Sequence, residues 1–490
     1  MKYLSRNAIF FGLSILLLTT GCKKDYLDRN DPGTLSWGDI YNTTSDFEAA
    51  LAGCYQSIQG PATNNIYLGD MTSDNAYLTR YQPSGPLADI DQLIASPTNS
   101  ILASYWADNY TTIQRVNLLL DKMVGSDVPD QKQKEIAAEA KFLRAYSYFN
   151  LVRVFGGVPL YDNYPALNDI YEVPRSSADS VLNFVVTDLL EASKVDSYRT
   201  PDELATAGGK ATNVAANTLL GKAYLWKRDF ANAETTLGNI VNTSGLALID
   251  LNQLYNADNP INKEIIFSIN YERTANFSSP FATSIIPYNC PPIYPNTPQV
   301  PAGGGAGMIE PYIASKFSPQ DKRNQFIDTA TFTYTSILDT NIYSRKYYDP
   351  ATTFNYLSGS NTIILRYADV LLMYAEALNQ NGKTAQAYQY VNQVRSRAGI
   401  GNLAAGFSKD QMFQALADER QREFLLEGDR WFDLCWRGIA FLKQEMNKYI
   451  PNAYLTIYRN KLVVKDYLIL FPIPEDQINV KPVLVQNPGY

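Results

Sequence analysis

Histidine is absent from all 490 residues of this chain. Its absence excludes Ser-His-Asp and Cys-His nucleophilic catalysis, and every metal site that uses imidazole ligands. Enzymatic chemistry would have to rely on carboxylates, lysine, tyrosine or cysteine. Cysteine is also scarce, because four residues make no disulfide framework in so long a chain. Cys54 and Cys435 lie in apolar helical patterns and are predicted to be buried thiols.

Positive charge is not in excess either. The chain has 42 Lys and Arg residues against 49 Asp and Glu residues, which gives a net charge of −7. Binding to long nucleic acid needs a basic surface, and no such stretch is present. Nucleic acid is therefore excluded as a partner.

A long apolar run that could span a bilayer is also missing. The run Ile9–Leu18 follows a basic start and is too short to cross a membrane, so residues 1–21 are predicted to be a secretory signal peptide. This leader ends in small residues and Cys22, and it resembles a bacterial lipoprotein leader in which the cysteine is lipidated. The alternative is a non-lipidated signal with an incidental cysteine. Residues 22–36 are predicted to form the lipidated N-terminal tether.

Helical periodicity is abundant in the remaining chain. The predicted fold class is mainly α, with about four degenerate tetratricopeptide-like helix pairs within residues 40–243 and 363–442. Such pairs stack because no single pair buries its own apolar face. In one pair, the small residues are expected to let two helices approach closely, and the pattern is carried by Leu220, Gly221, Tyr224, Phe230 and Ala233.

Three segments depart from this periodicity. Residues 60–98 are predicted to be a long irregular loop, and residues 244–362 a loop-rich insertion with short strands, dense in Pro, Gly and Tyr. Residues 443–490 are predicted to be an extended strap across the last helices. The whole body, residues 37–490, is expected to be a single domain.

The stretch ERQREFLLEGDRWFDL, residues 419–434, concentrates acids and arginines. On a continuous helix, Glu419, Glu423 and Glu427 would share one face, each with an arginine three residues away. Paired carboxylates could serve a glycosidase, but a catalytic acid needs a raised pKa, which neighbouring arginines oppose. The motif is therefore interpreted as a buried structural network. Gly428 is expected to mark the close approach of another element.

Four stretches, taken together and in order, resemble the SusD/RagB family of outer-membrane nutrient-binding lipoproteins. They are AEAKFLRAYSYFNLVRVFGGVPL (138–160), LRYADVLLMYAEALNQNG with VNQVRSRAG (365–399), ERQREFLLEGDRWFDLCWRG (419–438) and LILFPIPEDQINVKPVLVQNPGY (468–490). The resemblance implies a tetratricopeptide-like scaffold, a loop-rich ligand face, and a lid role over a SusC-like TonB-dependent transporter. It carries over no catalytic residue, so the chain is not expected to be an enzyme.

The ligand site is predicted from side-chain chemistry, because sugars are bound by aromatic rings and by polar groups that fix their hydroxyls. The loop GDMTSDNAYLTRY (69–81) supplies both kinds, SYWADNY adds a tryptophan, and IIPYNCPPIY in the insertion adds two tyrosines. In the family the first long loop and the insertion flank the glycan site. The predicted ligand contacts are Asp70, Asp74, Asn75, Tyr77, Arg80, Tyr81, Trp106, Tyr288 and Tyr294.

The expected function is a cell-surface lipoprotein that captures oligosaccharides and delivers them to the transporter. Two alternatives stay open: a peptide-binding protein of the same fold, and a carboxylate-based glycoside hydrolase. Acidic loop residues are the kind that bind structural calcium, but no EF-hand spacing is present, so no cofactor is predicted. The expected location is the outer membrane, with a lipid anchor and the protein facing the cell surface.

Overall fold

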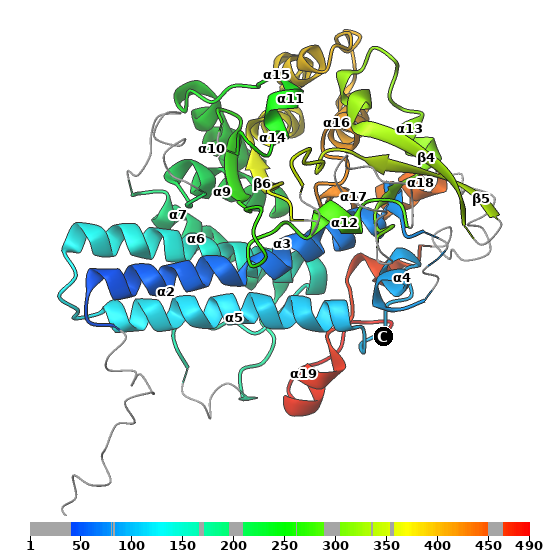
Figure 1. Ribbon diagram of the computed structural model, residues 1–490. Coiled ribbons are helices and arrows are strands. Elements are labelled where there is room, and N and C mark those ends of the chain that lie inside the picture. Colours follow the sequence, from blue (N-terminus) through cyan, green and yellow to red (C-terminus); the bar gives the residue numbers. More distant parts are fainter. Residues whose placement is uncertain are drawn as a thin grey trace, which may run out of the picture.

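The computed structural model describes residues 41–79, 81, 84–165, 171–195, 209–260, 262–288, 304–334, 337–352, 357–448 and 464–490. Helices dominate this part of the chain. Strands β4 (Ile327–Tyr334) and β5 (Ile337–Ser344) lie to one side of the helical body, whereas β6 (Thr362–Arg366) lies among the helices (Figure 1). The predicted mainly α fold is confirmed.

The scaffold is built from long helices in both halves of the chain. Their bounds are α2 (Thr44–Ser57), α3 (Gln59–Ile66), α5 (Ser100–Met123), α6 (Asp130–Phe155), α7 (Ala178–Ala192), α9 (Asn213–Trp226), α10 (Phe230–Thr243), α14 (Tyr367–Gln380), α15 (Thr384–Arg397), α16 (Lys409–Glu423), α17 (Arg430–Arg437) and α18 (Ile439–Lys448).

The four predicted helix pairs are present: α2 packs on α5, α6 on α7, α9 on α10, and α14 on α15. The glycine of the tetratricopeptide pattern sits at one of these crossings. A Cβ placed on Gly221 would lie 2.5 Å from Leu237 Cδ2, so only a glycine lets α9 and α10 approach this closely. Ala233 and Ala387 are fully buried on the second helices of their pairs. Small residues thus have the role predicted for them.

The helix ends follow local chemistry. Thr43 and Asp46 form a capping box that starts α2, and Ser408 and Gln411 form another that starts α16. Gly156, with a φ of +73°, ends α6 in a conformation that favours glycine.

The insertion is irregular, as predicted, and contains short elements. Within the described residues, its strands and those paired with them form three two-stranded antiparallel sheets, β1–β3, β2–β6 and β4–β5. The strands are β1 (Ala76–Tyr77), β2 (Ile265–Ile269), β3 (Met308–Ile309), β4 (Ile327–Tyr334), β5 (Ile337–Ser344) and β6 (Thr362–Arg366). The short helices are η3 (Tyr67–Met71), α4 (Pro86–Asp91), α11 (Leu251–Leu254), α12 (Phe281–Ser284), α13 (Pro311–Ala314), η5 (Lys322–Phe326), η6 (Asp466–Ile469) and α19 (Glu475–Val480).

The segment 60–98 contains more helix than predicted, since α3, the π-helical turn η3 and α4 all lie in it. The sequence lacks an apolar period here because polar contacts hold α3 in place. The amide of Asn65 donates to Tyr146 Oη at 3.2 Å, and the Tyr105 hydroxyl donates to Asn65 Oδ1 at 2.6 Å. These partners belong to α5 and α6, which no local pattern in α3 reveals.

The C-terminal strap also differs from the prediction. Helix α18 extends through Lys448, because Leu442 and Met446 are buried against the core. The strap then crosses the N-terminal half of the chain as well as the last helices. The Phe471 amide donates to Val154 O at 2.8 Å, and the Asn487 side chain donates to Phe155 O at 3.0 Å. It thereby covers the C-terminal end of α6.

Candidate functional site: a buried ion network beneath a tyrosine pair

The acidic motif is not one continuous helix. Helix α16 ends at Glu423 and α17 begins at Arg430, so residues 424–429 form a turn between them. Leu426 (φ +60°) and Gly428 (φ +89°) both have positive φ there. The prediction of a single helical face was therefore wrong for Glu427. The expectation for Gly428 is confirmed, since a Cβ on this residue would lie 3.0 Å from the Asn65 backbone carbon.

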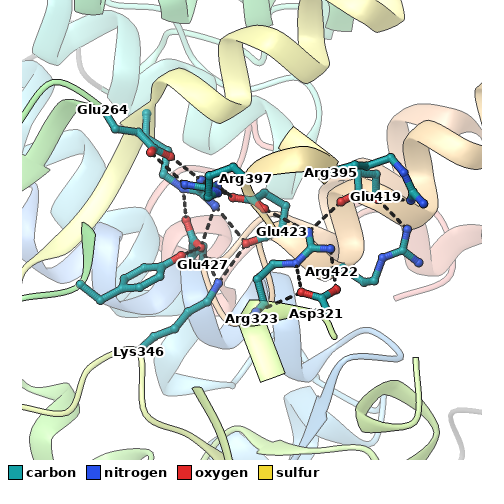
Figure 2. Close-up of polar contacts among 12 residues, drawn as sticks. Glu264, Asp321, Arg323, Lys346, Arg395, Arg397, Glu419, Arg422, Glu423 and Glu427 are labelled. Atoms are coloured by element: carbon teal, nitrogen blue, oxygen red, sulfur yellow. Dashed lines mark hydrogen bonds and ion pairs between the residues drawn. The ribbon is translucent and has the colours of Figure 1, made fainter. Parts of the chain in front are cut away.

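The carboxylates of Glu419 and Glu423 in α16 are buried among arginines from several elements (Figure 2). Glu419 accepts from Arg323 Nη1 at 2.7 Å, from Arg395 Nη1 at 2.9 Å and from its predicted partner Arg422 at 2.7 Å. Two of these three arginines, Arg323 and Arg395, come from outside α16, so the tertiary fold brings them to the carboxylate.

Glu423 lies at the centre of the network and has three arginine partners. It accepts from Arg366 Nη1 at 2.7 Å and from Arg323 Nη1 at 3.0 Å, and it also pairs with Arg397. The partner predicted within the helix, Arg420, instead donates to Asp369 Oδ1 at 2.7 Å. Tertiary contacts have thus replaced this helical pair.

Two further glutamates complete this part of the network. Glu427 accepts from Arg366 Nε at 2.8 Å and from Lys346 Nζ at 2.6 Å. Glu264, at the start of the insertion's strand β2, accepts from Arg366 Nη1 at 3.0 Å and from Arg397 at 2.9 Å. The guanidinium of Arg366 therefore joins three glutamates, Glu264, Glu423 and Glu427.

These contacts control the protonation of the acids. Burial alone would raise the pKa of Glu423, but Arg397, Arg366 and Arg323 lower it below its ordinary value. Burial is likewise outweighed at Glu419, whose pKa is lowered by Arg323 and Arg422. Carboxylates held ionised and sealed from water do not act as acids on a surface substrate. The structural interpretation of the motif is confirmed.

The loop residues predicted as polar ligand contacts are in the interior. Asp70, Asp74 and Asn75 have no exposed surface. Asp74 is bound by Arg430 at 2.8 Å and by the Gln421 amide at 2.8 Å, so Arg430 pairs with this loop and not with Glu427 as predicted. Ligand contact by these three residues is not supported by their position, because protein groups occupy their oxygens.

Two of the predicted aromatic contacts are also buried. Tyr77 is 4% exposed in strand β1, where it packs with Met308 and Tyr343. Trp106 is 3% exposed in α5, and its ring lies 5.0 Å from those of Tyr110 and Phe155. The spacing of Trp106 and Tyr110 is one that a core helix uses, and both rings serve that role.

Two predicted residues from distant parts of the sequence do come together. The rings of Tyr81 and Tyr288 have centroids 5.8 Å apart and are inclined by 34°. Both residues are half-buried. The backbone brings them together, because β1 pairs with β3 and the Thr79 amide donates to Gly305 O at 2.9 Å. The first loop and the insertion thus meet at an aromatic pair.

The remaining predicted residues lie outside the described part of the chain. They are Cys22, Arg80 and Tyr294. The described residues contain no cluster of three or more Asp, Glu or Cys side chains arranged to hold a metal ion. None of the described helices has both the length and the apolar character needed to cross a bilayer.

A separate cleft of about 790 Å³ lies between α2, α6 and β2. Its lining includes the polar side chains of Glu48, Gln56, Lys132 and Asn270. The aromatic ring of Phe277, a residue that is 57% exposed, also lines the cleft. The cleft does not include either tyrosine of the pair, and no sequence motif predicted it.

The sequence reasoning missed most partners of the buried acids. Arg366, Arg397 and Lys346 are far from residues 419–434 in the sequence, and spacing within one helix cannot find them. A weak signal was present, because Arg366 and Arg397 both fall in a stretch on which the family resemblance rests.

The described residues therefore form a scaffold of tetratricopeptide-like helix pairs, from which two loops carry the tyrosine pair. Two family models match the chain: one described as starch-binding associating with outer membrane matches residues 25–225, and that of the SusD family matches residues 328–490. The chain belongs to the SusD/RagB family.

Relatives and solved structures match nearly the whole chain. SusD-like protein P2 from Formosa agariphila is 26% identical over 519 residues, which cover 97% of this chain and 98% of that protein. A laminarin binding SusD-like protein has a TM-score of 0.78 at 24% identity, covering 92% of this chain and 100% of that one. Surface glycan-binding protein A from Bacteroides uniformis gives 0.78 at 24% identity, with 91% and 99% covered. The structural matches show a shared fold.

Proposed function

We propose that this protein is an outer-membrane lipoprotein that binds oligosaccharides at the tyrosine pair and delivers them to a TonB-dependent transporter without cleaving them. The observation that carries the proposal is the meeting of Tyr81 and Tyr288, which come from two loops on a rigid helical scaffold. Aromatic rings on half-buried residues suit the C–H faces of sugars. Family membership supports the same class of ligand, as do two structural neighbours, a surface glycan-binding protein A and a laminarin binding SusD-like protein.

The chemistry of the acids supports the proposal that the glycan is not cleaved. The chain has no histidine, and the carboxylates of residues 419–433 are ion-paired in the interior. A glycosidase needs two carboxyl groups that flank the bond in an accessible cleft. At the tyrosine pair the nearest predicted acids, Asp70 and Asp74, are buried and hydrogen-bonded to protein groups.

The test is binding of the purified protein to laminarin oligosaccharides, maltooligosaccharides, other plant and host glycans, and peptides, measured by calorimetry. We expect weak affinity, roughly micromolar to millimolar, because an open aromatic surface buries little area. Tyr81→Ala and Tyr288→Ala should each weaken glycan binding by about 0.5–1.5 kcal/mol. Phe277→Ala is the matched control, since it removes an exposed aromatic ring from the separate cleft.

Three outcomes would count against the proposal. Loss of glycan binding in Phe277→Ala, with both tyrosine variants unaffected, would move the site to the cleft. Peptide binding with no glycan bound would favour a peptide-binding protein. Time-dependent shortening of the glycans, followed by chromatography, would make the protein an enzyme.

A further inference from the structure

The residues 67–79, which lead to Tyr81 and are called here the first tyrosine segment, lie directly on the turn 424–428. A Cβ placed on Gly69 would lie 2.1 Å from Gly428 O, so the two backbones touch at this point. Gly69 belongs to the π-helical turn η3, a rare conformation that recurs at functional sites. No side chain other than hydrogen fits at residue 69 unless one of the two backbones moves.

The carboxylate of Asp70 fastens this contact. Its Oδ2 accepts from the Gly428 amide at 2.6 Å, and its Oδ1 accepts from the Leu426 amide at 3.1 Å and from the Asn75 side chain at 2.7 Å. In the described part of the chain Asp70 has no salt bridge, although it has no exposed surface. A buried carboxylate that forms no salt bridge costs stability unless hydrogen bonds satisfy it, and three N–H donors do so for Asp70.

Leu426 connects the turn 424–428 to residues 281–288 and 304–317, which include Tyr288 and are called here the second tyrosine segment. Its backbone has a φ of +60°, which is strained for a leucine, and the Tyr347 hydroxyl donates to its carbonyl at 2.8 Å. Its side chain lies in a small apolar cluster that draws on both tyrosine segments. The members of that cluster are Met71, Ala76, Leu78, Ala88, Ala306, Ile309, Ile313, Phe317, Leu425 and Leu426.

The two tyrosine segments also contact each other close to Tyr81 and Tyr288, at Gly305 and Thr79. A Cβ on Gly305 would lie 2.5 Å from the Thr79 side chain and 3.3 Å from Tyr288 Cβ. This contact places the backbone that leads to Tyr81 beside Tyr288. An unbroken series of contacts therefore runs from the ion network, through Asp70 and Leu426, to the tyrosine pair.

We infer that Asp70 and Leu426 are positioning residues: they hold the two tyrosine segments in register on the turn 424–428, so that this turn sets the geometry of the ligand surface. The inference rests on the proposed function of the tyrosine pair. If this inference holds, the acidic motif does more than stabilise the fold. The ion network holds the turn 424–428 in place, and the turn holds Tyr81 and Tyr288 in place.

The experiment measures the geometry of the pair without a ligand. Tyr81→Cys and Tyr288→Cys are spin-labelled in a background in which the four native cysteines are replaced, and dipolar broadening in the EPR spectrum reports whether the labels lie close together. We expect strong broadening in this background and its loss when Asp70→Asn is added. Asp188→Asn is the matched control, because Asp188 is a buried aspartate bound by Arg144 at 2.7 Å on the scaffold helices α6 and α7. It should leave the broadening unchanged.

A second variant and a second measurement keep the test decisive. Asn75→Ala removes one of the three donors to Asp70 and should give intermediate broadening, even if Asp70→Asn fails to fold. With both tyrosines intact, Asp70→Asn should weaken laminarihexaose binding by about tenfold, against less than about twofold for Asp188→Asn.

Two results would overturn the inference: full broadening in folded Asp70→Asn and Asn75→Ala, or equal loss in Asp188→Asn. Absence of glycan binding by the unaltered protein would instead remove the proposed function, while the EPR result would still decide whether Asp70 positions the loops.

Discussion

The guanidinium of Arg430 donates two hydrogen bonds to the carboxylate of Asp74, from Nε at 2.8 Å and from Nη2 at 2.9 Å, across 356 residues of the chain. Both side chains are buried. This bidentate pair joins the first loop to the start of α17, and so connects the two halves of the sequence at one point.

We expect Asp74→Ala to lower the free energy of unfolding by about 3–5 kcal/mol, because it leaves a buried arginine without its bidentate partner. Urea denaturation measures this. Glu191→Ala is the control: Glu191 pairs with Lys141 at 2.6 Å but its side chain is 48% exposed, so its loss should cost less than about 1 kcal/mol. Equal costs for the two variants would show that the buried pair contributes no more than the surface one.

The second prediction concerns acid stability. The pKa of Glu423 is lowered from its ordinary value of 4.5, because Arg397, Arg366 and Arg323 outweigh burial. Below pH 4.5 the unfolded chain takes up a proton that the folded protein does not, so this contribution is complete above pH 4.5 and is lost as the pH falls. Urea unfolding of Glu423→Gln should show lower stability at neutral pH and a shallower decline in acid. If the free energy of unfolding of Glu423→Gln fell as steeply in acid as that of the unaltered protein, the acid sensitivity would come from other groups.

Asp70 should have the opposite dependence on pH. Burial raises the pKa of Asp70 from 3.8 to about 7, despite hydrogen bonds from Asn75, Gly428 and Leu426, and Lys346 is the nearby cation. Between these values the folded protein keeps a proton that the unfolded chain releases. The contribution of Asp70 to stability should therefore fall as the pH rises toward 7, then level off. Relative to Asp70→Asn, the protein should lose about 2–3 kcal/mol between pH 5 and pH 7. A constant difference between the two would contradict a raised pKa.

Two glycines in long helices should respond in opposite ways to alanine. At Gly53 in α2 a Cβ would meet nothing within 4 Å, so Gly53→Ala should stabilise the protein by up to about 1 kcal/mol through helix propensity. At Gly221 the new Cβ would lie 2.5 Å from Leu237, so Gly221→Ala should destabilise it by about 1–3 kcal/mol. Thermal unfolding of both variants, measured side by side, tests the close approach of α9 and α10 at Gly221. A higher melting temperature for Gly221→Ala would contradict that close approach.

The proposed lipid anchor rests on Cys22. Cys22→Ala should leave the protein unprocessed or released from the membrane, because stable anchoring takes two or more acyl chains, which a lipoprotein cysteine carries. Cell fractionation and mass spectrometry of the mature N-terminus measure this, with Cys54→Ala as a control for loss of an internal thiol. Normal processing and membrane retention in Cys22→Ala would exclude lipidation at this residue.

The sequence by itself determined the scaffold. The helical period and the small residues at Gly221, Ala233 and Ala387 specify helix pairs locally, because residues three and four apart share a face whatever surrounds them. The lack of histidine excluded imidazole chemistry from the composition alone. The burial of Cys54 followed from its place in an apolar helical pattern, and burial raises the pKa of its thiol to about 12.

Only the tertiary structure decided which polar residues face a ligand. Asp70 and Tyr81 belong to the same loop and both have side chains suited to sugar binding, yet Asp70 is buried beneath the turn 424–428 and Tyr81 is half-buried beside Tyr288. The partners of Glu423 likewise come from three separate elements. Ion pairs and ring contacts act over a few ångströms in space and depend on how distant segments pack, which local spacing along one segment does not encode.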